Sequence, residues 1–266
     1  MEMATPEYFY KYRAIQNSNE LESDYSIEAL LNNWAIFSNR KNFNDIFDSK
    51  INFIKPNPKQ IKQLKNKLPK KDKAFFSSLV TDGKFTPEGH YFLSGLEKKF
   101  EEVIDGYVFY CVSKDPISNL MWSHYASSHR GFCIQFKSSF LKANRVMYQN
   151  EIPSINIIDL IKADNNIIDN KFLSNNIWMA LRTKLEEWKY EKEYRFQADN
   201  VMQELALESK EKYTKIQYTP DFIEAVIFGC RMEQKVKDYI ISKMPFKVKY
   251  KEARIQTSSI KIFNYK

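Results

Sequence analysis

Apolar and polar residues alternate in two short stretches near the start of the chain, and both predict strands. In residues 8–15 aromatic side chains alternate with basic ones, so three tyrosines face one side and Lys11 and Arg13 face the other. Residues 34–38 predict a second strand. Between the two strands a short helix is expected after Ser26, whose hydroxyl can cap it.

A polar loop and a run of helices are expected next. Residues 42–48 predict a shaped loop, because side chains such as those of Asn44 and Asp45 hydrogen-bond their own backbone. Interrupted helices fill residues 57–104. The last of these helices has a proline in its first turn and an apolar stripe made of Leu93, Leu96, Phe100 and Val103. We interpret this lysine-rich helical part, at about 55–104, as an insertion.

The middle of the chain predicts a strand, a helix and another strand. Residues 107–113 form an unbroken apolar run, which is typical of a central strand buried on both faces. A helix is expected over 117–128, after which Gly131 releases the chain into a strand over 132–136. Two histidines therefore lie near the end of this helix and the turn behind it.

The hydrophobic period changes at Trp188. Residues 155–185 have mainly helical periodicity, whereas residues 188–196 alternate apolar with charged side chains as a strand does. Glu191 and Glu193 fall on the charged face of that predicted strand, with their backbones roughly 7 Å apart.

Elements of both kinds alternate to the end of the chain. A strand over 224–229, a helix over 232–244 and short strands up to Phe263 complete the pattern, with no internal repeat. This order predicts an α+β fold with a mixed, mainly antiparallel sheet. Because no Gly/Ser/Pro-rich run divides the 266 residues, we expect one domain over residues 1–266 that carries the helical insertion.

Several features bear on the compartment. The N-terminal residues lack the basic and apolar regions of a signal peptide, and no window is apolar enough to span a membrane. The three cysteines lie among apolar residues and predict buried reduced thiols, with Cys133 as an alternative nucleophile. We expect a cytoplasmic protein without a membrane partner, and the oligomeric state is left open.

The net charge of +8 is unevenly distributed. Eight lysines and one aspartate lie between Lys55 and Lys73, and seven basic residues accompany one glutamate between Lys243 and Lys266. Two basic zones of this kind suit a polyanionic partner, such as nucleic acid or an acidic protein acceptor. The alternative is that they serve solubility alone.

Two groups of residues could carry chemistry. The carboxylates of Glu191 and Glu193 could act on a sugar and on an acceptor, or could instead lie on a solvated face neutralised by neighbouring basic residues. His124 is a candidate general acid or base, since histidine titrates near neutrality. His124 and His129 are five residues apart and lie on different helix faces unless the turn brings them together. No zinc-ligand spacing and no Gly-rich phosphate loop occur, so neither a metal nor a fold that depends on such a loop is expected.

Five motifs together resemble a large bacterial family of domains of unknown function. They are Tyr10-Lys11-Tyr12-Arg13, Phe43-Asn44-Asp45-Ile46-Phe47-Asp48, Trp122-Ser123-His124-Tyr125-Ala126 with His129-Arg130-Gly131-Phe132, Trp188-Lys189-Tyr190-Glu191-Lys192-Glu193-Tyr194-Arg195, and Val226-Ile227-Phe228-Gly229. The family usually has proline where Ile46 stands. The resemblance implies no reaction.

The order of elements also resembles that of ADP-ribosyltransferases, which split NAD and transfer ADP-ribose. The resemblance implies that Arg13 holds the NAD phosphate or ribose and that Phe37 and Ser38 form the floor of the nicotinamide pocket. It also implies that Glu193 stabilises the oxocarbenium-like ribose. Glu191 would orient the acceptor, and His124 would help to complete the pocket wall. The other residues expected to contact NAD are Lys11, Asn44, Asp45, Tyr125, His129 and Arg195. The chain lacks the Ser-Thr-Ser step of that superfamily.

The sequence therefore favours an NAD-consuming bacterial effector, toxin or defence protein, with NAD as co-substrate. Two alternatives stay open. A metal-independent nuclease would use His124 and His129 as an acid–base pair, with Arg130 or Lys11 on the phosphate. A non-catalytic module would use the same polar cluster to bind a nucleotide or a partner.

Overall fold

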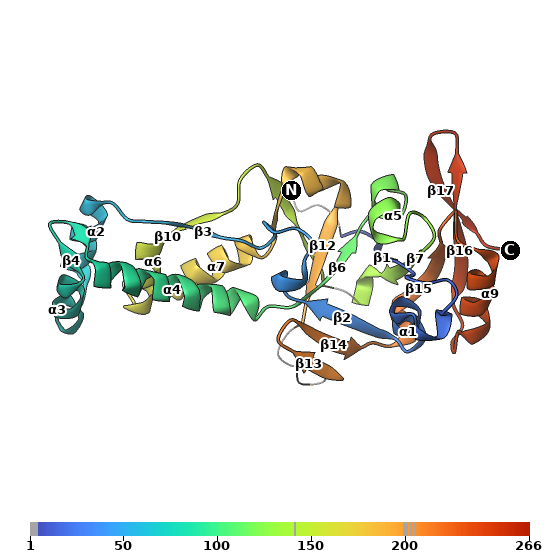
Figure 1. Ribbon diagram of the computed structural model, residues 1–266, viewed down its shortest axis with the longest axis horizontal. Coiled ribbons are helices and arrows are strands. Elements are labelled where there is room, and N and C mark those ends of the chain that lie inside the picture. Colours follow the sequence, from blue (N-terminus) through green and yellow to red (C-terminus); the bar gives the residue numbers. More distant parts are fainter. Residues whose placement is uncertain (1–4, 141, 199–201, 203, 205) are drawn as a thin grey trace. The chain divides into compact units, whose positions relative to one another are not determined.

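The computed structural model describes residues 5–140, 142–198, 202, 204 and 206–266, and these fall into two compact units (Figure 1). The first unit comprises Met1–Asn42, Val108–Val146 and Glu187–Lys266. The second comprises Phe43–Tyr107 and Met147–Glu186. Each unit is described here by itself.

A sheet of eleven described strands forms the first unit (Figure 1). In spatial order, its main path contains β13 (Glu208–Lys210), β14 (Tyr213–Gln217), β2 (Trp34–Ser38), β6 (Phe109–Ser113), β1 (Tyr8–Arg13), β7 (Phe132–Lys137), β15 (Ile223–Phe228), β16 (Lys249–Gln256) and β17 (Ser259–Asn264). Off this path, β12 (Glu193–Gln197) pairs with β6 and with β8 (Asn144–Arg145). Only β15 and β16 run parallel among these described pairs, which confirms the α+β fold with a mixed, mainly antiparallel sheet.

The sheet splits at β6. One edge of β6 pairs with β12 along its whole length. The other edge meets β1 only at Tyr10 and Ser113, and meets β2 only at Ser38 and Phe109. Strands β1 and β2 therefore pair with β6 at opposite ends of this edge. Between these two residue pairs, the middle of the edge pairs with neither strand.

Helices cover both faces of this sheet. Besides the short 3₁₀ helices η1 (Leu21–Ser23), η2 (Arg40–Asn42), η3 (Ser138–Phe140), η4 (Glu186–Glu191) and η5 (Pro220–Phe222), the first unit contains α1 (Tyr25–Leu31), α5 (Asn119–Tyr125) and α9 (Gln234–Lys243). One core cluster joins β-strand residues such as Phe9 and Phe228 to Leu30 of α1 and Ile240 of α9. A second cluster joins Trp122 of α5 to residues of the other face.

The second unit is mainly helical. It contains β3 (Asn52–Ile54), α2 (Pro58–Lys67), α3 (Lys70–Ser78), β4 (Val80–Thr81), β5 (Lys84–Phe85), α4 (Pro87–Asp105), β9 (Met147–Gln149), β10 (Ser154–Asn156), α6 (Ile157–Asp164), α7 (Asn170–Ala180) and β11 (Thr183–Leu185). Its strands form two-stranded pairs: β10 with β3, β11 with β9, and β4 with β5. None of the helices formed by described residues has the length and apolarity that a membrane crossing requires.

Several predicted element ends are wrong. Helix α1 is capped by Asp24, whose carboxylate accepts from the backbone nitrogens of Ser26 and Ile27, so Ser26 lies inside the first turn. On α4 the side chain of Val103 is half exposed, and that of Ile104 is buried instead. The buried face of the helix therefore continues from Phe100 to the residue four positions later rather than three. Such shifts of one or two residues leave the element order intact.

The helix predicted over 117–128 is shorter than expected. Helix α5 ends at Tyr125, and Ser127, Ser128 and His129 have positive φ angles of 47°, 52° and 70°. The turn is closed by the backbone nitrogen of Gly131, which donates to Ala126 at 2.8 Å. A Cβ on Gly131 would lie 2.1 Å from the main-chain oxygen of Arg13, so glycine is required where the chain enters β7.

Candidate active site

Glu191 and Glu193 do not lie on one continuous strand, contrary to the sequence prediction. Glu191 ends the 3₁₀ helix η4, Lys192 has a positive φ of 46°, and β12 begins only at Glu193. The two glutamates are 4% and 5% exposed, so the alternative of a solvated charged face is also wrong. The local twist at Lys192 gives each carboxylate its own surroundings.

Hydrogen bonds from the end of β6 hold this turn in place. The hydroxyl of Ser113 donates to the main-chain oxygen of Glu191 at 2.6 Å, and the nitrogen of Lys114 donates to the oxygen of Lys192 at 3.2 Å. The ammonium of Lys192 contacts Asp115 Oδ2 at 2.6 Å. The positive φ is thereby fixed by several contacts, as strained backbone at functional sites commonly is.

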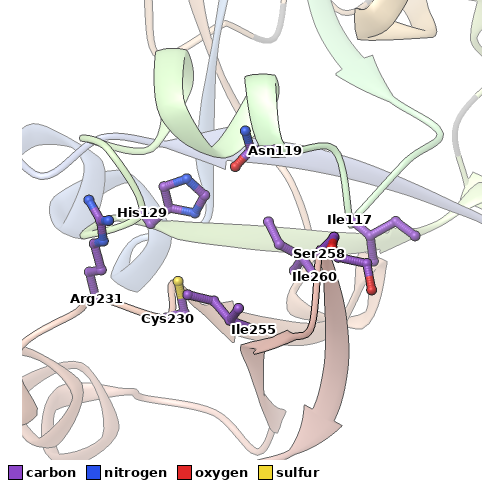
Figure 2. A pocket seen from close by; sticks show the side chains of 9 residues that line it. Ile117, Asn119, His129, Cys230, Arg231, Ile255, Ser258 and Ile260 are labelled. Atoms are coloured by element: carbon purple, nitrogen blue, oxygen red, sulfur yellow. The ribbon is translucent and has the colours of Figure 1, made fainter.

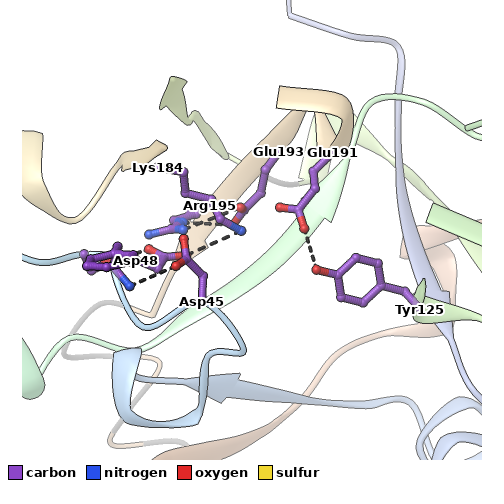
Figure 3. Close-up of polar contacts among 9 residues, drawn as sticks. Asp45, Asp48, Tyr125, Lys184, Glu191, Glu193 and Arg195 are labelled. Carbon is purple, nitrogen blue, oxygen red and sulfur yellow. Dashed lines mark hydrogen bonds and ion pairs between the residues drawn. The ribbon is translucent and has the colours of Figure 1, made fainter. Parts of the chain in front are cut away.

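The two carboxylates have chemically different partners (Figure 3). The phenol of Tyr125, on α5, donates a short hydrogen bond to Glu191 Oε1. Arg195 donates through Nε to Glu193 Oε1 at 2.9 Å and through Nη2 to Oε2 at 3.5 Å, in an ion pair that is almost fully buried. In these contacts Glu191 accepts from a phenol, whereas Glu193 pairs with a guanidinium.

Lys11 contacts the part of the β6 edge that pairs with neither β1 nor β2, which we call the split in the sheet. Its ammonium donates to the main-chain oxygen of Cys111 at 2.8 Å and lies 4.7 Å from the ring centre of Tyr110. Burial and the positive charge of Arg13 lower the pKa of Lys11 to about 8, against a smaller opposing effect of Glu193 and Glu191. Lys11 is thus electrostatically coupled both to Arg13 and to the carboxylates.

The charge of Arg13 acts on three tyrosines, Tyr25, Tyr110 and Tyr218. Its Nε atom is buried and has no hydrogen-bond partner among the described residues. Burial raises the pKa of Tyr110 to about 12, and the positive charge of Arg13 acts in the opposite direction. Phe37 is buried 5.6 Å from Tyr110, measured between ring centres, and Ser38 is half-buried beside it on β2. The structure therefore places Lys11 and Phe37 against the ring of Tyr110, and the charge of Arg13 acts on the same residue.

The two histidines have separate surroundings. His124 is exposed, with its ring 6.1 Å from that of Tyr190. The ring of His129 stacks on Trp122 at 6.4 Å, and its Nε2 lies 3.2 Å from the hydroxyl of Ser123. These separate contacts, made within the described part of the chain, give no support for an acid–base pair.

Two predicted site residues, Asn44 and Asp45, belong to the second unit. Asn44 is exposed, while Asp45 is buried and accepts from the nitrogen of Phe47 at 2.8 Å, as the predicted loop requires. The same unit contains a buried ion pair between Lys184 and Asp48, at 3.5 Å, which no sequence pattern predicts (Figure 3). Such a pair joins residues far apart in sequence, and no local pattern marks it.

The cysteines offer neither a disulfide nor an activated nucleophile among the described residues. All three cysteines are free, and burial raises the pKa of the Cys133 thiol well above its usual value, which opposes the formation of a nucleophilic thiolate. Among the described residues, no three or more His, Cys, Asp or Glu side chains are grouped so that they could hold a metal ion. Tyr110 and Ser113 are site residues that sequence reasoning missed, because they were read only as part of an apolar strand.

The fold and the site define an α+β protein with two buried carboxylates and two neighbouring cations at a split in its sheet. Residues 121–196 match a family model described as a protein of unknown function (DUF2971), which confirms the expected similarity to a domain-of-unknown-function family over that segment. The matched segment is less than a third of the chain and includes Tyr125, Glu191 and Glu193. No curated protein and no solved structure matches the chain.

Proposed function

We propose that the protein consumes NAD, as an ADP-ribosyltransferase or NAD glycohydrolase of the kind used by bacterial effectors, toxins or defence proteins. The observation that carries this proposal is the cation cluster at the split sheet. Lys11 lies over the ring of Tyr110, which packs against Phe37, the charge of Arg13 acts on the same tyrosine, and Arg13 keeps a buried, unpartnered Nε among the described residues. Two cations beside aromatic faces suit a pyrophosphate attached to flat bases.

The carboxylates would act at the ribose. The bond between the ribose anomeric carbon and nicotinamide would break with its electron pair leaving on nicotinamide, and water or an acceptor would add at that carbon after losing a proton. A fixed carboxylate favours the positive charge that develops on the sugar. The acceptor would be nucleic acid or protein, or water in the case of a glycohydrolase.

The partners of the two glutamates favour Glu191 for the sugar cation. The resemblance to ADP-ribosyltransferases assigns this role to Glu193, but Arg195 offsets its charge at 2.9 Å. The phenol of Tyr125 donates a hydrogen bond to Glu191 Oε1, and this contact would fix the orientation of that carboxylate toward the sugar. In this assignment Glu193 and Arg195 act as positioning residues for the turn that carries Glu191.

The test is nicotinamide release from NAD by the purified protein, followed by proton NMR, with the protein alone and with added RNA, DNA or cell extract. We expect Glu191→Gln to lower the rate by about 10²–10³-fold, as loss of one preorganised electrostatic group does in other enzymes. We expect Arg13→Gln to weaken NAD binding. The matched control is Glu211→Gln, which removes a surface carboxylate that is 77% exposed.

Two results would contradict the proposal. One is the absence of nicotinamide under all four conditions. The other is equal activity of the wild type and Glu191→Gln, since no role of that carboxylate at the sugar would then be left. Nucleic-acid cleavage that is lost in His124→Ala, without NAD turnover, would favour the nuclease instead.

A further inference from the structure

A separate pocket of about 380 Å³ lies on the same unit, at the turn that follows α5 (Figure 2). Three parts of the chain line it: Ile117 to His129 around α5, Cys230 and Arg231 after β15, and the end of the β16–β17 hairpin. Its volume is within the range of about 300–1,000 Å³ that is usual for small-molecule sites. It shares no lining residue with the cluster of Lys11, Arg13 and Glu191.

The backbone on one side of this pocket is strained and tightly held. His129 is the third of three successive residues with positive φ, and bulky residues adopt such angles rarely. Its nitrogen donates to Trp122 at 3.1 Å, and its oxygen accepts from Arg231 at 3.0 Å. A Cβ on Gly229 would lie 2.2 Å from the oxygen of His129, so a glycine is needed there for the close approach. The strain places the His129 ring at the pocket, stacked on Trp122.

The polar part of the lining consists of hydrogen-bond donors and a cation. Arg231 is exposed at the pocket, and burial together with the charge of Arg231 lowers the pKa of His129. Nδ1 of His129 is buried and has no hydrogen-bond partner among the described residues. The amide of Asn119 and the hydroxyl of Ser258 also line the pocket, the hydroxyl of Ser259 donates to the main-chain oxygen of Gln256 at 3.1 Å, and no lining residue is acidic. This set of groups suits an anion.

The other part of the lining is aliphatic and incompletely covered. Ile117 and Ile255 are 48% and 66% exposed, and Ile255 pairs with Ile260 across the hairpin. Aliphatic side chains that remain in water at a concave site gain free energy when an apolar group covers them. A ligand that is both anionic and partly apolar therefore matches the two parts of the lining.

We propose that this pocket binds a small organic anion, whose carboxylate or phosphate lies at Arg231 and His129 and whose short apolar body lies against Ile117 and Ile255. The site is additional to the proposed NAD site, and its occupancy does not depend on NAD turnover.

Ligand-observed NMR titrations with four probes test this proposal: butyrate, butyl phosphate, butanol and inorganic phosphate. We expect saturable binding of butyrate or of butyl phosphate, and the tighter of the two identifies the anionic group. Butanol lacks the charge and inorganic phosphate lacks the apolar body, so each should bind at least tenfold more weakly than that probe. Equal binding of butanol or of inorganic phosphate overturns the proposal, as does the absence of saturable binding by both organic anions.

Variants locate the binding. Arg231→Gln should weaken the tighter anion at least tenfold, and Ile255→Ser should weaken it by a smaller factor. The matched control is Arg130→Gln, which removes an exposed arginine of the same turn that does not line the pocket. Because Arg231 and Ile255 are exposed, both variants should fold. Equal affinities of Arg231→Gln and Arg130→Gln, or an unchanged affinity of Ile255→Ser, contradict the assignment.

Discussion

Replacing Glu193 by glutamine removes the carboxylate that pairs with Arg195 and keeps the shape of the side chain. The side chains of Arg195 and Glu193 are 0% and 6% exposed, so water cannot take the place of the lost charge. Removing one member of a buried ion pair typically costs about 3–5 kcal/mol. Glutamine retains an oxygen that can accept from Arg195, so we expect the lower end, about 3 kcal/mol.

This loss should be visible in thermal unfolding. For proteins of 150–250 residues or more, each kcal/mol lowers Tm by about 2–4 °C, so Glu193→Gln should melt roughly 6–12 °C below the wild type. Glu211→Gln breaks an exposed ion pair with Lys41 and should cost less than about 1 kcal/mol.

A melting temperature of Glu193→Gln equal to that of Glu211→Gln would refute the reasoning. It would mean that the ion pair contributes no more than a surface pair despite its burial.

Three further predictions concern Lys11, Tyr125 and Gly131. Between about pH 8 and 10.5 the free energy of unfolding of the wild type, measured in urea, should rise with pH relative to that of Lys11→Met. The reason is that in this range Lys11 is protonated in the unfolded chain but has lost its proton in the folded chain. Parallel plots of unfolding free energy against pH for the two proteins would contradict this. Tyr125→Phe should lower nicotinamide release about 10–100-fold, as expected for one hydrogen bond to a charged group, and an unchanged rate would exclude this role. Gly131→Ala should destabilise the fold by about 1–3 kcal/mol, because the added Cβ would meet a main-chain oxygen. The control, Gly95→Ala on α4, places its Cβ in open space and should stabilise the fold by about 0.5–1 kcal/mol. Equal denaturation midpoints of the two variants would contradict the packing argument.

The sequence pattern predicted much of the sheet because alternation reports burial directly. Strand β2 begins and ends where its pattern does, at Trp34 and Ser38. The pattern was less informative at helix ends. Asp24 and Ser26 are both good caps, and only the position of the backbone nitrogens decides between them. The alternation from Trp188 to Glu191 was misleading, because hydrogen bonds from the distant β6 fix this segment as a 3₁₀ helix and a tight turn.

The candidate site was only partly predictable for the same reason. Alternation placed Lys11 and Arg13 on one face of a strand, and the structure has them there. It could not show that β1 meets β6 at a single residue pair, which lets Lys11 reach the oxygen of Cys111. That split depends on the pairing of strands that lie far apart in the chain, such as Tyr10 of β1 with Ser113 of β6. The neighbourhood of Arg13 and Phe37 depends on it as well.

Glu191 and Glu193 illustrate how position can outweigh residue type. Both are buried glutamates two residues apart, and both adjoin β6. Glu191 accepts a hydrogen bond from a residue of α5, whereas Glu193 pairs with an arginine on its own strand. The single positive φ at Lys192 separates these surroundings, because it ends one element and starts the next. A change at Lys192 that restored a regular strand would place both carboxylates on one face and remove the distinction on which the proposed chemistry of Glu191 rests.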